Sequence, residues 1–342
     1  MGRVDDDLKR RGRRAIASLR TGQGSAAPTA PGAGPDSHVE TEGSEDIEAP
    51  RDLPAFNPPP LEHTTDASTR QLLAQGTEEP TPLLLPSVLS IANQKGGVGK
   101  TTTAVNLGAA LAEEGYRILV VDLDPQSNAS TGLGINARDL QASVYDVIMN
   151  DARLDDCIEP TSLKNLFVAP ATIDLAGAEI ELVPAFSREL KLRRALDEIR
   201  DDYDIVLVDC PPSLGLLTIN GLAAADGVLV PIQCEYYALE GLGQLLRNVG
   251  LVRSNLNPGL DVRGIILTMY DARTRLADQV VEEVRSHFGR RVYETVVPRT
   301  VRLSEAPSFG QPIIVFDSTS RGAKAYRALA KEVCRDAKRR TR

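Results

Sequence analysis

The sequence predicts an α/β fold: a doubly wound, mostly parallel sheet with helices on both faces, preceded by a disordered N-terminal tail. Three observations lead to this prediction. After Pro86, short apolar runs alternate with longer stretches of helical periodicity. The runs are apolar throughout, as in strands that helices cover on both sides. A glycine-rich turn joins the first run to the first helical stretch, and we expect residues 87–342 to form one domain.

Residues 1–86 differ in composition from the rest of the 342-residue chain. They hold half of the 22 prolines and are rich in Ala, Gly, Ser, Thr and acidic residues. Such a segment buries too little apolar surface to offset its ordering entropy, so we expect it to be disordered. Its first 20 residues contain seven basic side chains, which suit either a solvated tail or an arm that touches nucleic acid.

The formal net charge of −8 is distributed unevenly. The tail carries −5 of it and residues 87–342 carry −3, so the acidity of the chain does not exclude binding to a polyanion. The four cysteines are scattered singly, there is no hydrophobic leader, and no apolar run approaches membrane-spanning length. These features predict a cytoplasmic protein without a disulfide framework or a membrane span.

The expected elements follow one another in regular order. The strands are Val88–Asn93, Ile118–Val121, Leu166–Ala169, Ile205–Val208, Val228–Val230 and Gly264–Leu267. The helices are Thr101–Glu114, Phe186–Arg200, Leu214–Ala224, Leu239–Ser254, Ala277–Phe288 and Arg321–Arg339. Because a helix separates consecutive strands, the strands are expected to pair in parallel.

The most specific motif lies between the first strand and the first helix. It reads Lys95-Gly96-Gly97-Val98-Gly99-Lys100-Thr101-Thr102. Glycines let the backbone N–H groups wrap a phosphate, and the helix N-terminus adds its dipole. Lys100 is placed to contact the β and γ phosphates, and the Thr101 hydroxyl is placed to ligate Mg²⁺. The motif therefore predicts a P-loop that binds a nucleoside triphosphate.

Lys95 departs from the ordinary P-loop pattern. That pattern has its first glycine at position 94, where this chain has Gln94, and the loop gains a second lysine instead. In this it resembles the deviant P-loop of the ParA/MinD class of ATPases. The resemblance implies that Lys95 reaches across a dimer interface to the phosphates held by the other subunit. A polyanionic nucleotide between two subunits is better neutralised when each subunit donates a cation.

Carboxylates follow two of the expected strands. Asp122 and Asp124 come directly after the second strand, and Asp209 ends the apolar run Ile205–Val208 in the manner of a Walker B segment. Ligands of open α/β sheets bind at this edge. We expect Asp209 to hold Mg²⁺ through a water molecule and Asp122 to support the metal shell. Resemblance to the ParA motif makes Asp124 the residue that positions the attacking water.

Three further segments resemble chromosomal ParA/Soj partition ATPases, and the resemblance extends from Val88 to about Ala337. The segments are Pro231–Gly241, Thr268–Thr274 and Pro298–Ser308. The resemblance implies ATP and Mg²⁺ as cofactors, a homodimer in the ATP state, nonspecific binding of double-stranded DNA, and slow hydrolysis that a ParB-type partner stimulates. It places the protein at the nucleoid.

The resemblance also assigns residues outside the P-loop. Arg273 and Arg302 match positions that contact DNA, and guanidinium groups suit phosphate. Pro298 and Arg299 match positions near the adenine.

Two other functions share the same loop. A MinD-like membrane-positioning ATPase needs an amphipathic C-terminal anchor, and the last helix has few bulky apolar residues for that purpose. A metabolic ATP-dependent ligase or kinase needs a second substrate pocket, for which the sequence shows no distinct motif. A nucleotide switch with very slow hydrolysis would have the same sequence signature as an ATPase.

Overall fold

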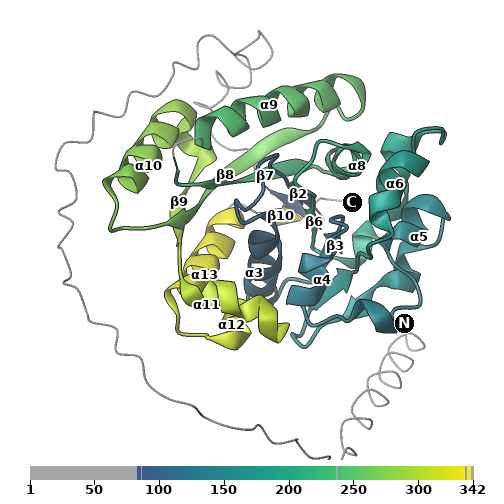
Figure 1. The fold of residues 1–342 in the computed structure, drawn as a ribbon, viewed down its shortest axis with the longest axis horizontal. Coiled ribbons are helices and arrows are strands. Elements are labelled where there is room, and N and C mark those ends of the chain that lie inside the picture. Colours follow the sequence, from purple (N-terminus) through teal and green to yellow (C-terminus); the bar gives the residue numbers. More distant parts are fainter. Residues whose placement is uncertain (1–82, 86, 236–237, 336, 340–342) are drawn as a thin grey trace, which may run out of the picture. The chain divides into compact units, whose positions relative to one another are not determined.

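The structure is a computed structural model that describes residues 83–85, 87–235, 238–335 and 337–339 (Figure 1). Its strands are β1 (Leu84–Leu85), β2 (Ser87–Ile91), β3 (Ile118–Asp122), β4 (Glu159–Pro160), β5 (Leu166–Ala169), β6 (Ile205–Asp209), β7 (Gly227–Gln233), β8 (Asp261–Tyr270), β9 (Val292–Pro298) and β10 (Lys338–Arg339). Residues 1–82, most of the predicted tail, lie outside the described part of the chain.

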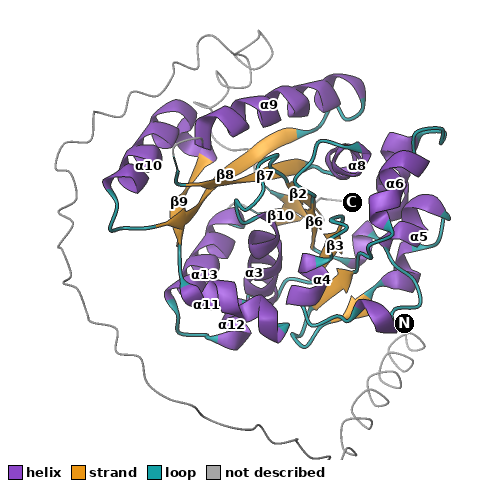
Figure 2. Ribbon diagram, viewed as in Figure 1, coloured by secondary structure: helices purple, strands orange, loops and turns teal. Residues whose placement is uncertain are grey.

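Helices connect these strands (Figure 2). The α-helices are α3 (Lys100–Glu113), α4 (Asn128–Gly132), α5 (Val144–Met149), α6 (Leu175–Glu181), α7 (Lys191–Asp197), α8 (Leu216–Ala224), α9 (Ala238–Asn255), α10 (Arg275–Phe288), α11 (Val301–Glu305), α12 (Ile313–Phe316) and α13 (Arg321–Val333). Short 3₁₀ turns join several of them.

Eight strands form one sheet in the order β4-β5-β3-β6-β2-β7-β8-β9. All neighbours pair in parallel except β4, which runs antiparallel to β5 at the edge. Within this sheet, β2 comes first in the sequence and lies near the middle; β3, β4 and β5 are added on one side, β6 then enters between β3 and β2, and β7, β8 and β9 are added on the other side. The carboxyl ends of β2, β3 and β6 therefore meet where the winding changes direction. The predicted fold class is confirmed.

The inner strands are buried on both faces. In β3, Leu119 and Val121 belong to the hydrophobic cluster on the side of α5 to α10, whereas Ile118 and Val120 belong to the cluster around α3 and α13. Val206 in β6 follows the same alternation. Burial on two faces explains why these strands read as continuous apolar runs in the sequence.

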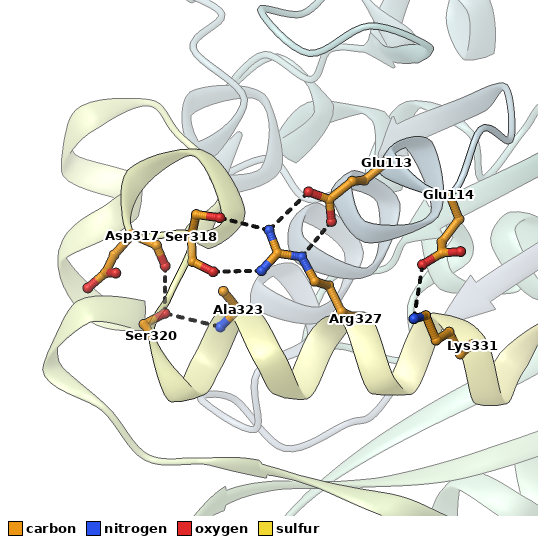
Figure 3. Close-up of polar contacts among 8 residues, drawn as sticks. All are labelled: Glu113, Glu114, Asp317, Ser318, Ser320, Ala323, Arg327 and Lys331. Atoms are coloured by element: carbon orange, nitrogen blue, oxygen red, sulfur yellow. Dashed lines mark hydrogen bonds and ion pairs between the residues drawn. The ribbon is translucent and has the colours of Figure 1, made fainter.

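Helix α3 packs closely against the sheet and beside α13, which explains its alanine-rich composition; α13 itself packs against β9 (Figure 1). A polar clamp holds the two helices together (Figure 3). The Arg327 guanidinium on α13 donates to the Glu113 carboxylate on α3, with N–O distances of 2.5 and 2.9 Å, and Lys331 lies 3.6 Å from Glu114. The apolar face of α13, including Tyr326, is buried against the core.

The predicted last helix is too long. Helix α13 ends at Val333, and Lys338–Arg339 forms strand β10, which pairs in parallel with β1. The backbone N–H of Lys338 donates to the carbonyl of Leu83 over 2.7 Å. Leu83 and Leu85 are buried in the core, so the folded part begins before the predicted boundary at Pro86. A two-residue pairing leaves no periodicity by which the sequence could show it.

The predicted helix Phe186–Arg200 is also different in the structure. Ser187 has a left-handed backbone (φ 50°), which an α-helix cannot contain, and only α7 within this range is α-helical. The sequence reasoning also missed β9 and the short helices α4, α5, α6, α11 and α12. Within the described residues, no helix is long and apolar enough to cross a membrane.

Close packing of α3 on the sheet gives a first prediction. A Cβ added at Gly108 would lie 3.2 Å from Val120 and 3.4 Å from Leu166 and Leu207. We expect Gly108→Val to lower the free energy of unfolding by about 1–3 kcal/mol through overpacking. Urea unfolding would measure it. Gly243→Val on α9 is the control, because an added Cβ there meets nothing nearer than Arg247 at 4.0 Å; an equal loss in both variants would contradict the packing argument.

Candidate nucleotide-binding site

The glycine-rich turn forms an open loop before α3. Gly97 and Gly99 have left-handed backbones, with φ of 76° and 84°, and a Cβ at Gly96 or Gly97 would meet nothing within 4 Å. Gly99 is the N-cap of α3, and Lys100 is its first residue. The loop thus leaves room for a phosphate at the N-terminus of a 14-residue helix, where the helix dipole favours an anion.

Two buried side chains fix this loop to the neighbouring strands. Asn93 donates to the carbonyl of Pro231 at 2.7 Å, and its side-chain oxygen accepts from the backbone N–H of Lys95 at 3.0 Å. The Thr268 hydroxyl lies 2.8 Å from the carbonyl of Val98 and 3.1 Å from that of Ile232. Strands β7 and β8 therefore hold the loop on both sides of Gly96 and Gly97.

Lys100 is buried inside the loop that it follows. Its side-chain Nζ donates to the carbonyl of Lys95 at 3.2 Å, and the residue is 6% exposed. Burial lowers the pKa of its ammonium group, while Asp209 and Asp124 oppose that shift. A buried ammonium beside open backbone N–H groups suits a polyphosphate.

The first of the three site carboxylates, Asp122, is fully engaged by protein donors. One oxygen accepts from the backbone N–H of Asp124 at 3.1 Å, and the other accepts from the N–H and hydroxyl of Ser130 at 2.9 and 2.7 Å. Burial raises its pKa to about 6. Asp122 therefore organises the loop that carries Asp124.

Asp209 faces Asp122 across paired strands and is fully buried. Neither of its oxygens accepts a hydrogen bond of good geometry, although the Thr101 hydroxyl is near enough to lower its pKa. Burial, followed by the charge of Asp122, raises that pKa well above its usual value. A buried carboxylate without a donor is a place for a cation, and Thr101 and Asp209 therefore fit Mg²⁺.

The described residues contain no group of three or more His, Cys, Asp or Glu side chains that could form a metal site on their own. Mg²⁺ keeps several waters and is commonly held by one or two protein ligands together with substrate phosphates.

Asp124 lies at the rim of this charged group. It is 7% exposed, and one of its oxygens accepts from the backbone N–H of Gln126 at 3.0 Å. The turn after it contains Ser127 with a left-handed backbone, and the Ser127 hydroxyl donates to the carbonyl of Ala171 at 3.0 Å. The structure thus brings Lys100, Thr101, Asp122, Asp124 and Asp209 together at one sheet edge.

Lys95 stands apart from this group. Its side chain is 37% exposed, and its ammonium lies 3.7 Å from the carboxylate of Glu235, just after β7. Of the two lysines in the loop, Lys100 is therefore the buried one and Lys95 the exposed one.

Pro298 and Arg299 lie at the carboxyl end of β9. Pro298 pairs with Tyr270 at the end of β8, and the backbone N–H of Arg299 donates to the carbonyl of Tyr270 at 2.9 Å. Thr268, two residues before Tyr270, holds the P-loop. The two residues predicted to lie near the adenine are thus one strand away from the loop.

Arg273 and Arg302 are both exposed and both paired with acids. The Arg273 guanidinium contacts both oxygens of Asp271, at 2.9 and 2.6 Å, and its side chain is 88% exposed. The Arg302 side chain, 59% exposed, lies 3.2 Å from Glu305 and 3.6 Å from Asp317. Exposed ion pairs are weak, so a phosphate can compete for either guanidinium.

Comparison with known proteins identifies the family. A family model described as an AAA domain matches residues 86–262. The sporulation initiation inhibitor protein Soj of Bacillus subtilis (strain 168) is 60% identical over 246 residues, which cover 72% of this chain and 97% of that protein. The chromosome partitioning protein ParA of Myxococcus xanthus (strain DK1622) is 53% identical over 265 residues, covering 78% and 94%. The chain belongs to the Soj/ParA family of chromosome partitioning ATPases.

A solved structure supports the fold and the cofactors of the Soj/ParA chain. Cobyrinic acid a,c-diamide synthase from Mycobacterium smegmatis, with bound ADP and magnesium, matches it with a TM-score of 0.64 and 42% identity, covering 73% of this chain and 94% of that one. The resemblance seen in the sequence is confirmed, and ATP with Mg²⁺ is confirmed as the cofactor pair of the family.

Four residues of this Soj/ParA site escaped the sequence reasoning. Asn93 and Thr268 anchor the loop, Ser130 engages Asp122, and Glu235 pairs with Lys95. Asn93 stands two positions before Lys95, and the segments that resemble ParA/Soj proteins contain Thr268 and Glu235. The contacts of Asn93 with Pro231, Thr268 with Val98 and Glu235 with Lys95 join residues more than a hundred positions apart, so nothing local in the sequence shows them. Ser130 and Asp122 are eight positions apart, and no motif marks their contact.

The unsatisfied carboxylate gives a second prediction. We expect Asp209→Asn to raise the free energy of unfolding by about 1–3 kcal/mol at pH 7 without Mg²⁺, because it removes a buried charge. Since the pKa of Asp209 is raised, the folded wild type holds its proton near pH 4 and loses stability as pH rises, so the gain should grow from pH 4 to pH 7.

Urea unfolding across this pH range, with a chelator, measures the gain. Added Mg²⁺ and ADP should stabilise the wild type more than Asp209→Asn, because the variant keeps the phosphate contacts and loses the Mg²⁺ ligand. Asp155→Asn, at an exposed carboxylate, is the control. A wild type more stable than Asp209→Asn at pH 7 in chelator would contradict the assignment.

Proposed function

We propose that this chain is a partition ATPase that dimerises in the ATP state, binds double-stranded DNA without sequence preference, and hydrolyses ATP when a ParB-type partner stimulates it. Its work is chromosome or plasmid segregation at the nucleoid, in the cytoplasm. The observation that carries the proposal is the exposed side chain of Lys95. The same P-loop already has a buried lysine, Lys100, to contact the phosphates of its own nucleotide. Family membership supports the proposal.

The charges at the sheet edge fit hydrolysis. Lys100 and the loop N–H groups hold the phosphates, and Thr101 and Asp209 hold Mg²⁺, which when bound offsets negative charge on the phosphates. Asp124 orients a water for attack on the γ-phosphate. Asp122 fixes the Asp124 backbone through a 3.1 Å hydrogen bond and so sets the direction of that carboxylate. Hydrolysis without the partner is slow.

The exposed position of Lys95 is the basis for proposing an ATP-dependent dimer. A lysine that serves its own nucleotide would be expected inside the loop, as Lys100 is, whereas Lys95 extends to Glu235 on the surface. In the proposed dimer, each Lys95 contacts the phosphates of the other subunit, so association requires ATP in both.

DNA binding uses exposed guanidinium groups that the fold holds on the surface. Arg302 is the second residue of α11, and Arg273 lies just before Thr274, the N-cap of α10. Both are positioned by neighbouring acids, which phosphates replace on binding. Such contacts weaken steeply with salt.

Two observations favour partition over the other functions. The apolar residues of α13 that would serve as a membrane anchor, Tyr326, Leu329 and Val333, are buried against the core. The likeness to the synthase, at 42% identity, favours a ligase or kinase, but the identity to the Soj and ParA relatives is higher, at 60% and 53%.

The experiment that tests the proposed function is retention of nonspecific double-stranded DNA with ATP, ADP or no nucleotide. ATP-dependent retention is expected. Binding that is absent, or equal in all three states, would contradict the proposal.

Asp124→Ala is expected to bind ATP and accumulate as a DNA-bound dimer, because the nucleotide contacts remain while water positioning is lost. Hydrolysis should fall about 100-fold or more. Sizing chromatography with ATP and phosphate release measure the two effects. Asp139→Ala, at an exposed acid of a 3₁₀ turn, should behave as the wild type. A variant that stays monomeric with ATP would count against the role of Asp124.

Arg302→Glu is expected to keep ATP-dependent dimerisation and lose DNA retention. Binding should weaken about tenfold or more at low salt, with the slope of log affinity against log salt reduced by about one. Arg138→Glu makes the same charge change at an exposed arginine elsewhere on the surface. Unchanged DNA binding across a salt titration would rule out Arg302 as a contact.

A further inference from the structure

The ion pair between Lys95 and Glu235 joins the P-loop to the segment after β7. Its N–O distance is 3.7 Å, and the two side chains are 37% and 48% exposed. The pair is therefore accessible to solvent, and it involves Lys95, the extra lysine that an ordinary P-loop lacks.

Both partners of this pair sit on fixed backbone. The Glu235 carboxylate accepts from the side-chain amide of Gln233 at 2.5 Å, and its backbone N–H donates to the Gln233 carbonyl at 2.8 Å. Asn93 ties the backbone of Lys95 to Pro231 at the end of the same strand. The carboxylate is thus held beside the lysine by short contacts from one strand end.

The two loop lysines have separate carboxylates in this subunit. Lys100 is near Asp209 and Asp124, whereas Lys95 is paired with Glu235. Glu235 therefore keeps Lys95 out of its own phosphate loop, where Lys100 already stands. It also competes with any other anion for Lys95.

We propose that Glu235 is a positioning residue for Lys95: it holds the ammonium group in its own subunit and releases it when two ATP-bound subunits meet. This inference rests on the proposed function, in which Lys95 contacts the phosphates of the second subunit. Since the pair must break for that contact to form, Glu235 opposes dimerisation and sets the protein concentration at which it occurs. An exposed pair is weak enough to break each time.

The test is the dimer dissociation constant of the full chain with Mg²⁺ and a non-hydrolysable ATP analogue, measured by sedimentation. Glu235→Gln should lower the constant by about 1.4- to 5-fold, the range of an exposed ion pair. The effect should disappear in a Lys95→Gln background and shrink as salt rises, because salt screens exposed charges. Glu294→Gln, which removes an exposed pair with Arg335, is the matched control and should leave the constant unchanged.

Each outcome decides one of the two proposals. If Glu235→Gln unfolds cooperatively on heating, and so is folded, but its dimer is unchanged or weaker, the role of Glu235 is overturned. The proposed function is not affected by that result. A gain that persists without Lys95 also overturns the role of Glu235. A wild-type chain that stays monomeric with the analogue contradicts the proposed function, and the inference about Glu235 falls with it.

Discussion

Compensation of buried negative charge is the constraint on which the site depends. Parallel pairing brings Asp122 and Asp209 to the same level at the edge of the sheet, where both are buried. Asp122 obtains donors from Ser130 and Asp124, but Asp209 has only Lys100 and Thr101 nearby. The folded chain therefore holds more negative charge than its own groups neutralise there, which makes it a receptor for cations and for the nucleotide that accompanies them.

Local patterns in the sequence predicted the framework well. The apolar runs at β3, β5 and β6 and the helices from α8 to α10 were located to within a few residues, because burial on two faces and helical periodicity both leave continuous signals. The same reasoning missed β9 and merged residues 186–200 into one helix. Val292–Pro298 mixes exposed and buried positions at the sheet edge, so its sequence shows no continuous apolar run. The left-handed backbone at Ser187 could not be predicted either, because glycine is the residue that usually marks that conformation and this position is a serine.

In the candidate site, too, the sequence predicted some features and not others. The P-loop and the three aspartates could be found because each follows directly on a strand, and the sheet topology then gathers them. The hydrogen-bond partners and the burial of each side chain could not be predicted from the sequence. Nothing local distinguishes the satisfied carboxylate of Asp122 from the unsatisfied one of Asp209, or the buried Lys100 from the exposed Lys95; those differences come from partners such as Ser130 and Glu235.

The short pairing of β1 with β10 determines where anything attached to the chain leaves the domain. Leu83 lies at the amino end of the central strands, opposite the P-loop and separated from it by the length of β2, about 17 Å at 3.3 Å per residue. Lys338 lies beside it. A fluorophore, affinity tag or surface linker placed at either end of the domain would thus leave from the far edge of the sheet, and single molecules could be immobilised with the nucleotide face open to solution.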